Sequence, residues 1–271
     1  MSKIRINYIQ IFICFGIPWL LFFLSLFFGK EIYYFRSDTF WQRLTLYLQR
    51  PWFWRNFLPA AALFCIGSLI NLFIINKKHV PWLKFIMATA ILIAIDQTIQ
   101  FLVAAHHDTI RVSLVEGWIG IFPKSMSQDD KGIYLSNGQL EPSIHLLVCF
   151  LGMSLGYYVV RILYFFERER MLLVMSAFFY IAGFVCSALD TLVYEYGYDY
   201  IEIYSLCIFD IKDIYILLGF SSLLQSVMQN ADVLNKISIK KDIKRYLKWE
   251  YSIWQAWLVK LMRFFRAKKV I

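Results

Sequence analysis

Residues 171–190 read MLLVMSAFFYIAGFVCSALD, a run of apolar and small residues that carries no charge until it ends at an aspartate. A helix needs about 20 consecutive apolar residues to cross the hydrocarbon core of a bilayer. Backbone N–H and C=O groups in lipid must be paired within their own segment, so a run of this kind forms a helix. The stretch therefore predicts a transmembrane helix with a carboxylate at its end.

Five other stretches have the same character as this one. The full set of nearly charge-free stretches is Ile6–Gly29, Asn56–Asn76, Phe85–Ala105, Pro142–Val160, Met171–Leu189 and Ile214–Ala231. The chain is 59% hydrophobic and 17% charged, whereas soluble domains average about 45–50% apolar and about 25% charged residues. We therefore expect an all-α integral membrane protein with about six transmembrane helices.

Two connections between these helices resemble strands rather than spans. Residues 110–123 (IRVSLVEGWIGIFP) and 194–208 (YEYGYDYIEIYSLCI) are rich in β-branched and aromatic residues, which is typical of β-strands. The sequence therefore predicts a small extracytoplasmic β element beside the helices.

Lysine and arginine residues in short loops predict the orientation of the spans, because short cytoplasmic loops carry more of these residues than short external loops do. The residues that fall on one side of the six spans are Lys3, Arg5, Lys77, Lys78, Lys84, Arg161, Arg168 and Arg170, together with the lysine-rich tail. This places both termini in the cytoplasm and the 107–141 and 190–212 connections outside. The basic 30–55 connection is external in this arrangement, and we expect it to lie along the interface.

The net charge of +9 comes from basic residues at helix ends and in the tail. This distribution favours anionic membrane lipids rather than nucleic acid as the partner. In the tail, apolar residues recur at helical spacing at Trp254, Trp257, Leu258, Leu261, Met262 and Phe265. We expect an amphipathic helix in the membrane interface; a soluble helix that packs on a partner protein is the alternative.

Carboxylates gather at the ends of the last two spans and in the loop between them. They are Asp190, Asp199, Glu202, Asp210 and Asp213. Two carboxylates held close together share a proton and so supply an acid and a base at neutral pH, which is how aspartic peptidases activate water. The alternative is that these residues cap helices and face solvent. Asp213 at a helix N-terminus would be stabilised by the helix dipole without any chemistry.

Asp96 differs from this group because it lies inside the third apolar stretch, where a carboxylate needs a partner or water. His106 and His107 are adjacent, and neighbouring residues on a helix face different ways. They therefore do not favour a metal site. The chain also contains no glycine-rich phosphate loop, and we expect neither a metal nor another cofactor.

The stretch from Ser187 to Gly219 resembles the lipoprotein signal peptidase family (signal peptidase II). That family has an Asn-x-x-Asp-Arg motif, then a Val-x-Asp-x-Ile-Asp strand, then a Phe-Asn-x-Ala-Asp motif. The counterparts here are SALDT at 187–191, YDYIE at 198–202 and FDIKD at 209–213. Upstream, Asp96-Gln97 resembles the family's Asp-Gln pair. Asn137-Gly138 lies where the family has an asparagine-containing β-region.

The resemblance implies an aspartic endopeptidase of the bacterial inner membrane that removes signal peptides from lipid-modified prolipoproteins without a metal. It places the catalytic pair at Asp199 and Asp213. Supporting or substrate-binding roles fall on Asp96, Asn137, Ser187, Asp190, Glu202 and Asp210. The departures from the family pattern include Ser187 and Asp210 in place of Asn, Thr191 in place of Arg and Gln100 in place of Lys.

The resemblance covers the four-helix part of the chain, residues 85–231. Residues 1–84 are expected to add two N-terminal spans with an interfacial segment, and residues 232–271 a basic amphipathic cytoplasmic tail. Two other classes of function stay open. One is a catalytically inactive or accessory membrane protein on the same scaffold, and the other is a transporter or ion-pathway protein that uses Asp96 and its neighbours as a relay.

Overall fold

The structure is a computed structural model of the chain. It describes residues 7–21, 57–75, 82–115, 119–125, 142–166, 170–194, 197–203, 207–231 and 239–267. The predicted interfacial connection 30–55 and the candidate residue Asn137 lie outside these ranges.

Among the described residues, five helices are long and apolar enough to cross a membrane. They are α5 (Phe57–Ile75), α6 (Trp82–His106), α7 (Pro142–Phe166), α8 (Arg170–Tyr194) and α9 (Ile211–Gln229). The predicted helical membrane fold is thereby confirmed. The first predicted span is described as far as Leu21, where it forms a shorter apolar helix that begins as α1 (Tyr8–Ile11) and continues through a π-helical turn, η1 (Phe12–Gly16).

Two helix ends differ from the sequence prediction, which placed Asp190 and Asp213 as caps. Asp190 lies within α8, which continues to Tyr194. Helix α9 begins at Ile211, so Asp210 is its N-cap and Asp213 is the third residue of the helix. The apolar pattern missed both extensions because polar residues continue the helices beyond the charge-free stretches.

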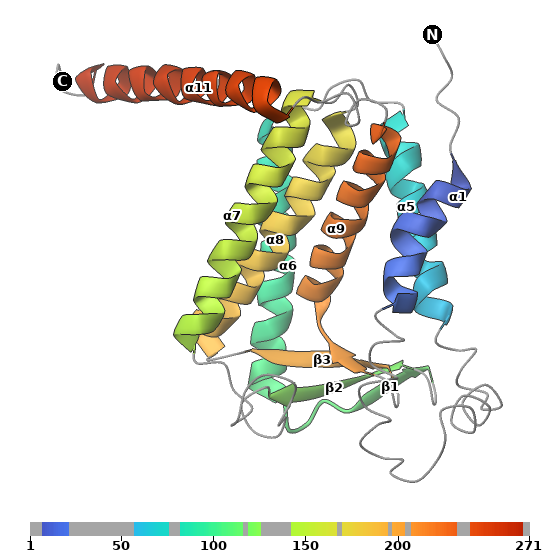
Figure 1. Cartoon of the computed structure of the whole chain (residues 1–271). Helices are drawn as coiled ribbons and strands as arrows, with labels where there is room; N and C mark the ends of the chain where they lie inside the picture. The colour runs from blue at the N-terminus through green and yellow to red at the C-terminus, as the bar shows by residue number, and fades with distance from the viewer. Residues whose placement is uncertain are drawn as a thin grey trace.

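A small antiparallel sheet lies across one end of the helices (Figure 1). Its strands are β1 (Val112–Val115), β2 (Ile119–Ser125), β3 (Tyr198–Ile203) and β4 (Cys207–Phe209), paired in sequence order. Both segments predicted to be strand-like therefore form strands. The chain passes from β4 directly into α9, so the sheet fixes where the last span begins.

Helices α8 and α9 approach each other closely through small residues. A Cβ atom on Gly183 would lie 3.1 Å from the backbone oxygen of Lys212, and one on Gly219 would lie 3.2 Å from that of Ser176. The hydroxyl of Ser176 donates a hydrogen bond to the carbonyl of Gly219 at 2.8 Å. Small residues let helix backbones meet in membranes, and here they bring the first turn of α9 against α8.

The N-terminal helices pack beside α9 (Figure 1). Residues of α1, η1 and α5, including Ile11, Phe15 and Leu63, form a buried cluster that includes Leu218 of α9. A pair of buried amides also joins α5 to α9. Asn71 Nδ2 donates to Gln225 Oε1 at 3.0 Å, and Gln225 Nε2 donates to Asn71 Oδ1 at 2.7 Å. This reciprocal pair holds the N-terminal helices against the four-helix core.

Helix α11 (Ile239–Ala267) runs across the opposite end of the bundle from the sheet and extends beyond it (Figure 1). Its start is earlier than the predicted amphipathic segment at Trp254, which lies in its second half.

We predict that replacing either buried amide alone destabilises the protein more than replacing both. Asn71→Leu or Gln225→Leu leaves a polar partner unsatisfied in an apolar environment, which costs about 1–2 kcal/mol. The double variant removes both polar groups and is expected to recover part of that loss. Unfolding free energies in detergent, measured for the wild type, both single variants and the double variant, give the coupling. Additive losses in the double variant would show that the amides do not interact.

Candidate active site

Three carboxylates converge where β3 meets the start of α9. Asp199, Asp210 and Asp213 each offer an oxygen, and these oxygens all lie within 4.8 Å of one another. Asp199 comes from β3, while Asp210 and Asp213 come from the first turn of α9. The antiparallel pairing of β3 with β4 brings the two elements together, because β4 leads straight into α9. One water molecule can bridge oxygens at this separation.

A capping box fixes the two aspartates of α9. The Asp210 side chain accepts a hydrogen bond from the backbone N–H of Asp213, and the Asp213 side chain accepts one from that of Asp210, both at 3.3 Å. Such reciprocal bonds satisfy backbone donors that a helix start leaves free. The capping interpretation of these acids is therefore correct for their backbone contacts. It leaves their other oxygens available for further contacts.

Lys212 lies between two of the buried acids. Its ammonium is 3.0 Å from Asp190 Oδ2 of α8 and also forms an ion pair with Asp210 Oδ2. Asp190 is 1% exposed and Asp210 is fully buried. The lysine is 7% exposed, so the three charged groups form a largely desolvated unit that ties α8 to α9.

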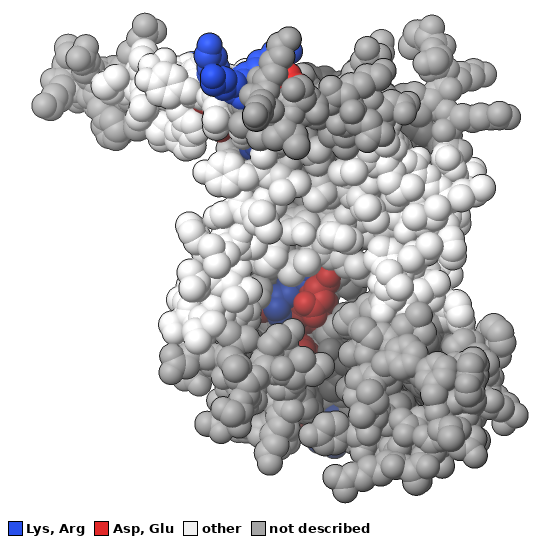
Figure 2. Space-filling view, in the orientation of Figure 1, with Lys and Arg blue, Asp and Glu red and all other residues white. Residues whose placement is uncertain are grey.

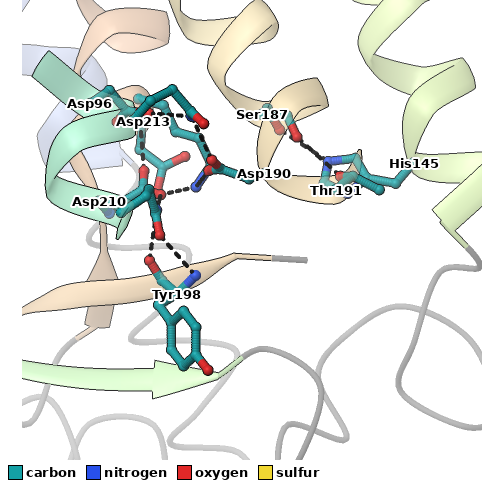
Figure 3. A network of polar contacts seen from close by, with 11 residues as sticks. Asp96, His145, Ser187, Asp190, Thr191, Tyr198, Asp210 and Asp213 are labelled. Carbon is teal, nitrogen blue, oxygen red and sulfur yellow. Dashed lines mark hydrogen bonds and ion pairs between the residues drawn. The ribbon is translucent and has the colours of Figure 1, made fainter. Parts of the chain in front are cut away.

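Two glutamines of α6 extend this network to a third helix, from which Asp96 also comes (Figure 3). Gln97 Nε2 donates to Asp190 Oδ1 at 2.7 Å and to Asp96 Oδ2 at 3.2 Å. Gln100 donates to Asp210 Oδ2 at 3.2 Å and also holds the β3 backbone, donating to the carbonyl of Tyr198 and accepting from its N–H. Gln100 thereby positions the residue next to Asp199.

Asp96 is fully buried in α6 and takes part in the network. It accepts a hydrogen bond from Gln97 at 3.2 Å, and the thiol of Cys186 of α8 lies close enough to interact with it. The prediction that this intramembrane carboxylate needs a partner is met by these two contacts. Nearby, Tyr200 of β3 is 3% exposed, and burial raises the pKa of its phenol. The phenol therefore stays protonated at neutral pH.

Ser187 and Thr191 form a separate polar group with His145 of α7, apart from the carboxylates (Figure 3). His145 Nε2 is 3.1 Å from the Ser187 hydroxyl, and Nδ1 is 3.1 Å from the Thr191 hydroxyl. Thr191 donates its own proton to the Ser187 carbonyl at 3.0 Å. Its oxygen must then accept from Nδ1–H, which leaves Nε2 to accept from Ser187. This group joins α7 to α8.

Glu202 of β3 lies opposite Gly120 and Ile208 in the sheet. It is half-buried, and among the described residues it does not belong to the group of three converging carboxylates. Of the predicted site residues, the structure thus brings together Asp96, Asp190, Asp199, Asp210 and Asp213.

The three converging carboxylates differ in how far they are exposed, and therefore in whether water or a substrate can contact them. Asp213 is exposed, Asp199 is half-buried and Asp210 is fully buried. Figure 2 shows acidic and basic side chains in a hollow next to the uncharged middle of the molecule. A metal ion could fit among three such oxygens, but the ammonium of Lys212 already neutralises Asp210. The arrangement supplies two accessible carboxylates that can hold a water, and a third that is committed to an ion pair.

The sequence did not predict the roles of Lys212 and His145, or the hydrogen bonds of Gln100 to Asp210 and to the backbone of Tyr198. Lys212 was placed outside the last span because the apolar stretch begins after Asp213. The signal that could have found it is a lysine between two aspartates at a helix start. His145 lies in an apolar span, where a titratable residue is a candidate for a polar contact. Gln100 is one helical turn after Asp96, and so points toward the same side.

Part of the chain is similar to known proteins. The model of a family described as signal peptidase (SPase) II matches residues 88–229, just over half of the chain. A solved structure described as a bacterial membrane enzyme at 2.3 Å resolution is 15% identical, with a TM-score of 0.45 over 57% of this chain and 92% of that one. A second with the same description at 1.9 Å is 14% identical, with a TM-score of 0.44 over 54% and 94%. A search of curated proteins found no match.

Proposed function

Because the chain belongs to the signal peptidase II family, we propose that it is an aspartic endopeptidase that removes signal peptides from lipid-modified prolipoproteins. The observation that carries the proposal is the approach of Asp199 and Asp213, whose oxygens lie within 4.8 Å of each other at the end of a membrane-spanning helix.

In the proposed mechanism, Asp199 and Asp213 share one proton, since two carboxylates at this distance do not both ionise easily. The ionised partner takes a proton from the bridging water as that water attacks the scissile carbonyl. The protonated partner donates a hydrogen bond to the carbonyl oxygen, and its proton then passes to the leaving amine. The partial exposure of Asp199 and Asp213 leaves them accessible to water and peptide.

The substrate reaches this site from the bilayer in our proposal. The hollow with the charged side chains adjoins an uncharged surface (Figure 2), and the spans contribute exposed apolar residues such as Ile95, Phe101 and Leu192. The diacylglyceryl chains of a lipid-modified cysteine can lie against that surface while the peptide bond enters the polar site.

We predict that Asp199→Asn and Asp213→Asn each lower the cleavage rate of a lipobox-containing prolipoprotein by at least about a hundredfold. Each variant loses a group that moves a proton in the transition state, which is worth about 10²–10⁴ in rate. Cleavage is measured with purified protein in detergent or vesicles. Asp108→Asn is the matched control because Asp108 is an exposed acid beyond the end of α6.

Retention of full cleavage by either variant would remove that residue from the mechanism. A wild-type protein that is folded but cleaves no prolipoprotein would favour the inactive or accessory alternative.

The active site faces the outside of the cell in this proposal, with both termini in the cytoplasm. The distribution of Lys and Arg along the sequence supports this orientation. Helix α11, which exposes Lys244, Arg245 and Lys248, lies at the end of the bundle opposite the sheet (Figure 1).

Cysteine labelling in intact cells tests the orientation. A membrane-impermeant reagent is expected to label Asp108→Cys in intact cells and Lys248→Cys only after lysis, with the parent chain labelled in parallel to measure its own thiols. The reverse result would invert the topology and place the carboxylates on the wrong side for the proposed substrate.

We also propose that α11 lies on the cytoplasmic surface of the membrane and contacts anionic lipids. Its first half is anchored to α7. Arg161 makes two hydrogen bonds to the Glu250 carboxylate, at 2.9 and 3.1 Å, and its guanidinium lies 4.8 Å from the centre of the Trp249 ring. Tyr246 and Trp249 also pack against Phe165 of α7.

The second half of α11 continues the same face beyond the bundle. Trp257 is seven residues after Glu250, so both lie on one side of the helix. Trp254 and Leu258 flank it, and all three side chains are about half exposed. Since the anchored half presents this face to a membrane-spanning helix, the exposed half presents it to the surrounding bilayer. Lys248 is nine residues before Trp257 and lies on the opposite face, as expected of an interfacial helix.

A polarity-sensitive fluorophore on the full-length protein tests this placement. Attached at Trp257→Cys in reconstituted vesicles, it is expected to report an apolar environment, more strongly with anionic than with zwitterionic lipid. Attached at Lys248→Cys, on the opposite face, it is expected to report water. Equal exposure to water at both positions would contradict the proposal, and so would a signal independent of lipid charge.

A further inference from the structure

We propose that Lys212 is a positioning residue of this active site, whose ammonium pairs with the carboxylates of Asp190 and Asp210 and so leaves the shared proton to Asp199 and Asp213. This inference rests on the proposed peptidase function and adds a residue to it.

Burying the ammonium of Lys212 at its location is energetically unfavourable unless the charge is compensated. It lies in the first turn of a membrane-spanning helix with 7% of its surface exposed. An ammonium at such a place is destabilising unless it is paired and hydrogen-bonded. Its backbone carbonyl packs against Gly183 of α8, where a Cβ would come within 3.1 Å. The close contact of the two helices therefore holds the lysine against α8.

The two partners of Lys212 have their other contacts fixed as well. Asp190 accepts from Gln97 through Oδ1 and pairs with the lysine through Oδ2. Asp210 accepts the Asp213 N–H through Oδ1, and Gln100 and the lysine through Oδ2. Both oxygens of each carboxylate are engaged. Neither group is therefore free to activate a water.

The lysine also acts at a distance on the proposed catalytic pair. Its ammonium interacts electrostatically with both Asp199 and Asp213. The titratable groups that surround it from α6, α7, α8, α9 and β3 are Asp96, His145, Cys186, Asp190, Asp199, Asp210 and Asp213. Among the described residues of this group, Lys212 is the one that forms ion pairs with the acids, whereas His145 contacts the hydroxyls of Ser187 and Thr191.

Removing the ammonium changes which acids hold protons. Two desolvated carboxylates would lose their counter-ion, and a buried carboxylate without one takes up a proton. Asp210 would then compete with its neighbours Asp199 and Asp213 for the proton that catalysis needs. The consequence is a changed distribution of protons among these acids, and with it the loss of the charge state that the catalytic pair needs.

Four proteins test this role by their kinetics: wild type, Lys212→Met, Lys212→Arg, and Lys212→Met combined with Asp210→Asn. We expect Lys212→Met to lower kcat about tenfold or more at neutral pH with little change in KM, and to move the acidic limb of the pH–rate profile to higher pH. Lys212→Arg keeps the charge and is expected to retain most of the activity. The double variant removes the competing acid and is expected to recover part of what Lys212→Met loses.

Infrared spectroscopy of the same proteins gives a readout that needs no substrate. Lys212→Met is expected to show an additional C=O stretch of a protonated carboxylic acid at neutral pH, and the double variant is expected to show less of it. If the wild type cleaves no prolipoprotein, the peptidase proposal fails while this band still reports the role of the lysine.

A folded Lys212→Met protein with an unchanged pH–rate profile and no new carboxylic acid band would overturn the inference. An equal loss of activity in Lys212→Arg and Lys212→Met would also overturn it, because the charge would then not be the property that matters.

Discussion

Compensation of buried charge at one end of the helix bundle is the constraint on which the rest of the structure depends. Asp190 and Asp210 can be desolvated only because Lys212 lies between them and the glutamines of α6 bind their remaining lone pairs. Leaving one member of such a set unpaired is far more costly than the net gain from the intact set. Helices α6, α8 and α9 must therefore meet in one register, and that register also sets the distance from Asp213 to β3.

The packing farther along the helices stabilises the same relative position of α8 and α9. Gly183 and Gly219 let α9 lie directly on α8, so the first turn of α9 reaches Asp190. The Asn71–Gln225 pair then braces the other side of α9 with α5. Polar contacts between membrane helices are individually modest. Because these contacts are spread along α9, they resist both rotation of the helix about its axis and sliding along it. A purely apolar contact between smooth surfaces resists these movements less well.

The fold was more predictable from sequence than the site was. Apolar runs reveal spans because the bilayer imposes their length, and the strand segments stood out by their β-branched and aromatic residues. The convergence of Asp199 and Asp213 followed only from a resemblance, since spacing cannot show that a strand folds back onto a helix start. Lys212 was missed because its partner Asp190 is 22 positions away in the sequence. Ser187 and Thr191 face His145, a contact between two helices that no local pattern contains.

The departures from the family motifs occur in structurally paired sets. Asp210 stands at the motif's Asn and Lys212 at its Ala, and these two residues form an ion pair. Ser187 and Thr191 stand at the motif's Asn and Arg, and both bind His145. A positive charge is thus absent at position 191 and present at 212, where it contacts Asp190. Restoring the motif's Ala at position 212 alone would leave Asp190 and Asp210 without their cation, so positions 210 and 212 are coupled through this ion pair, while positions 187 and 191 are coupled through His145.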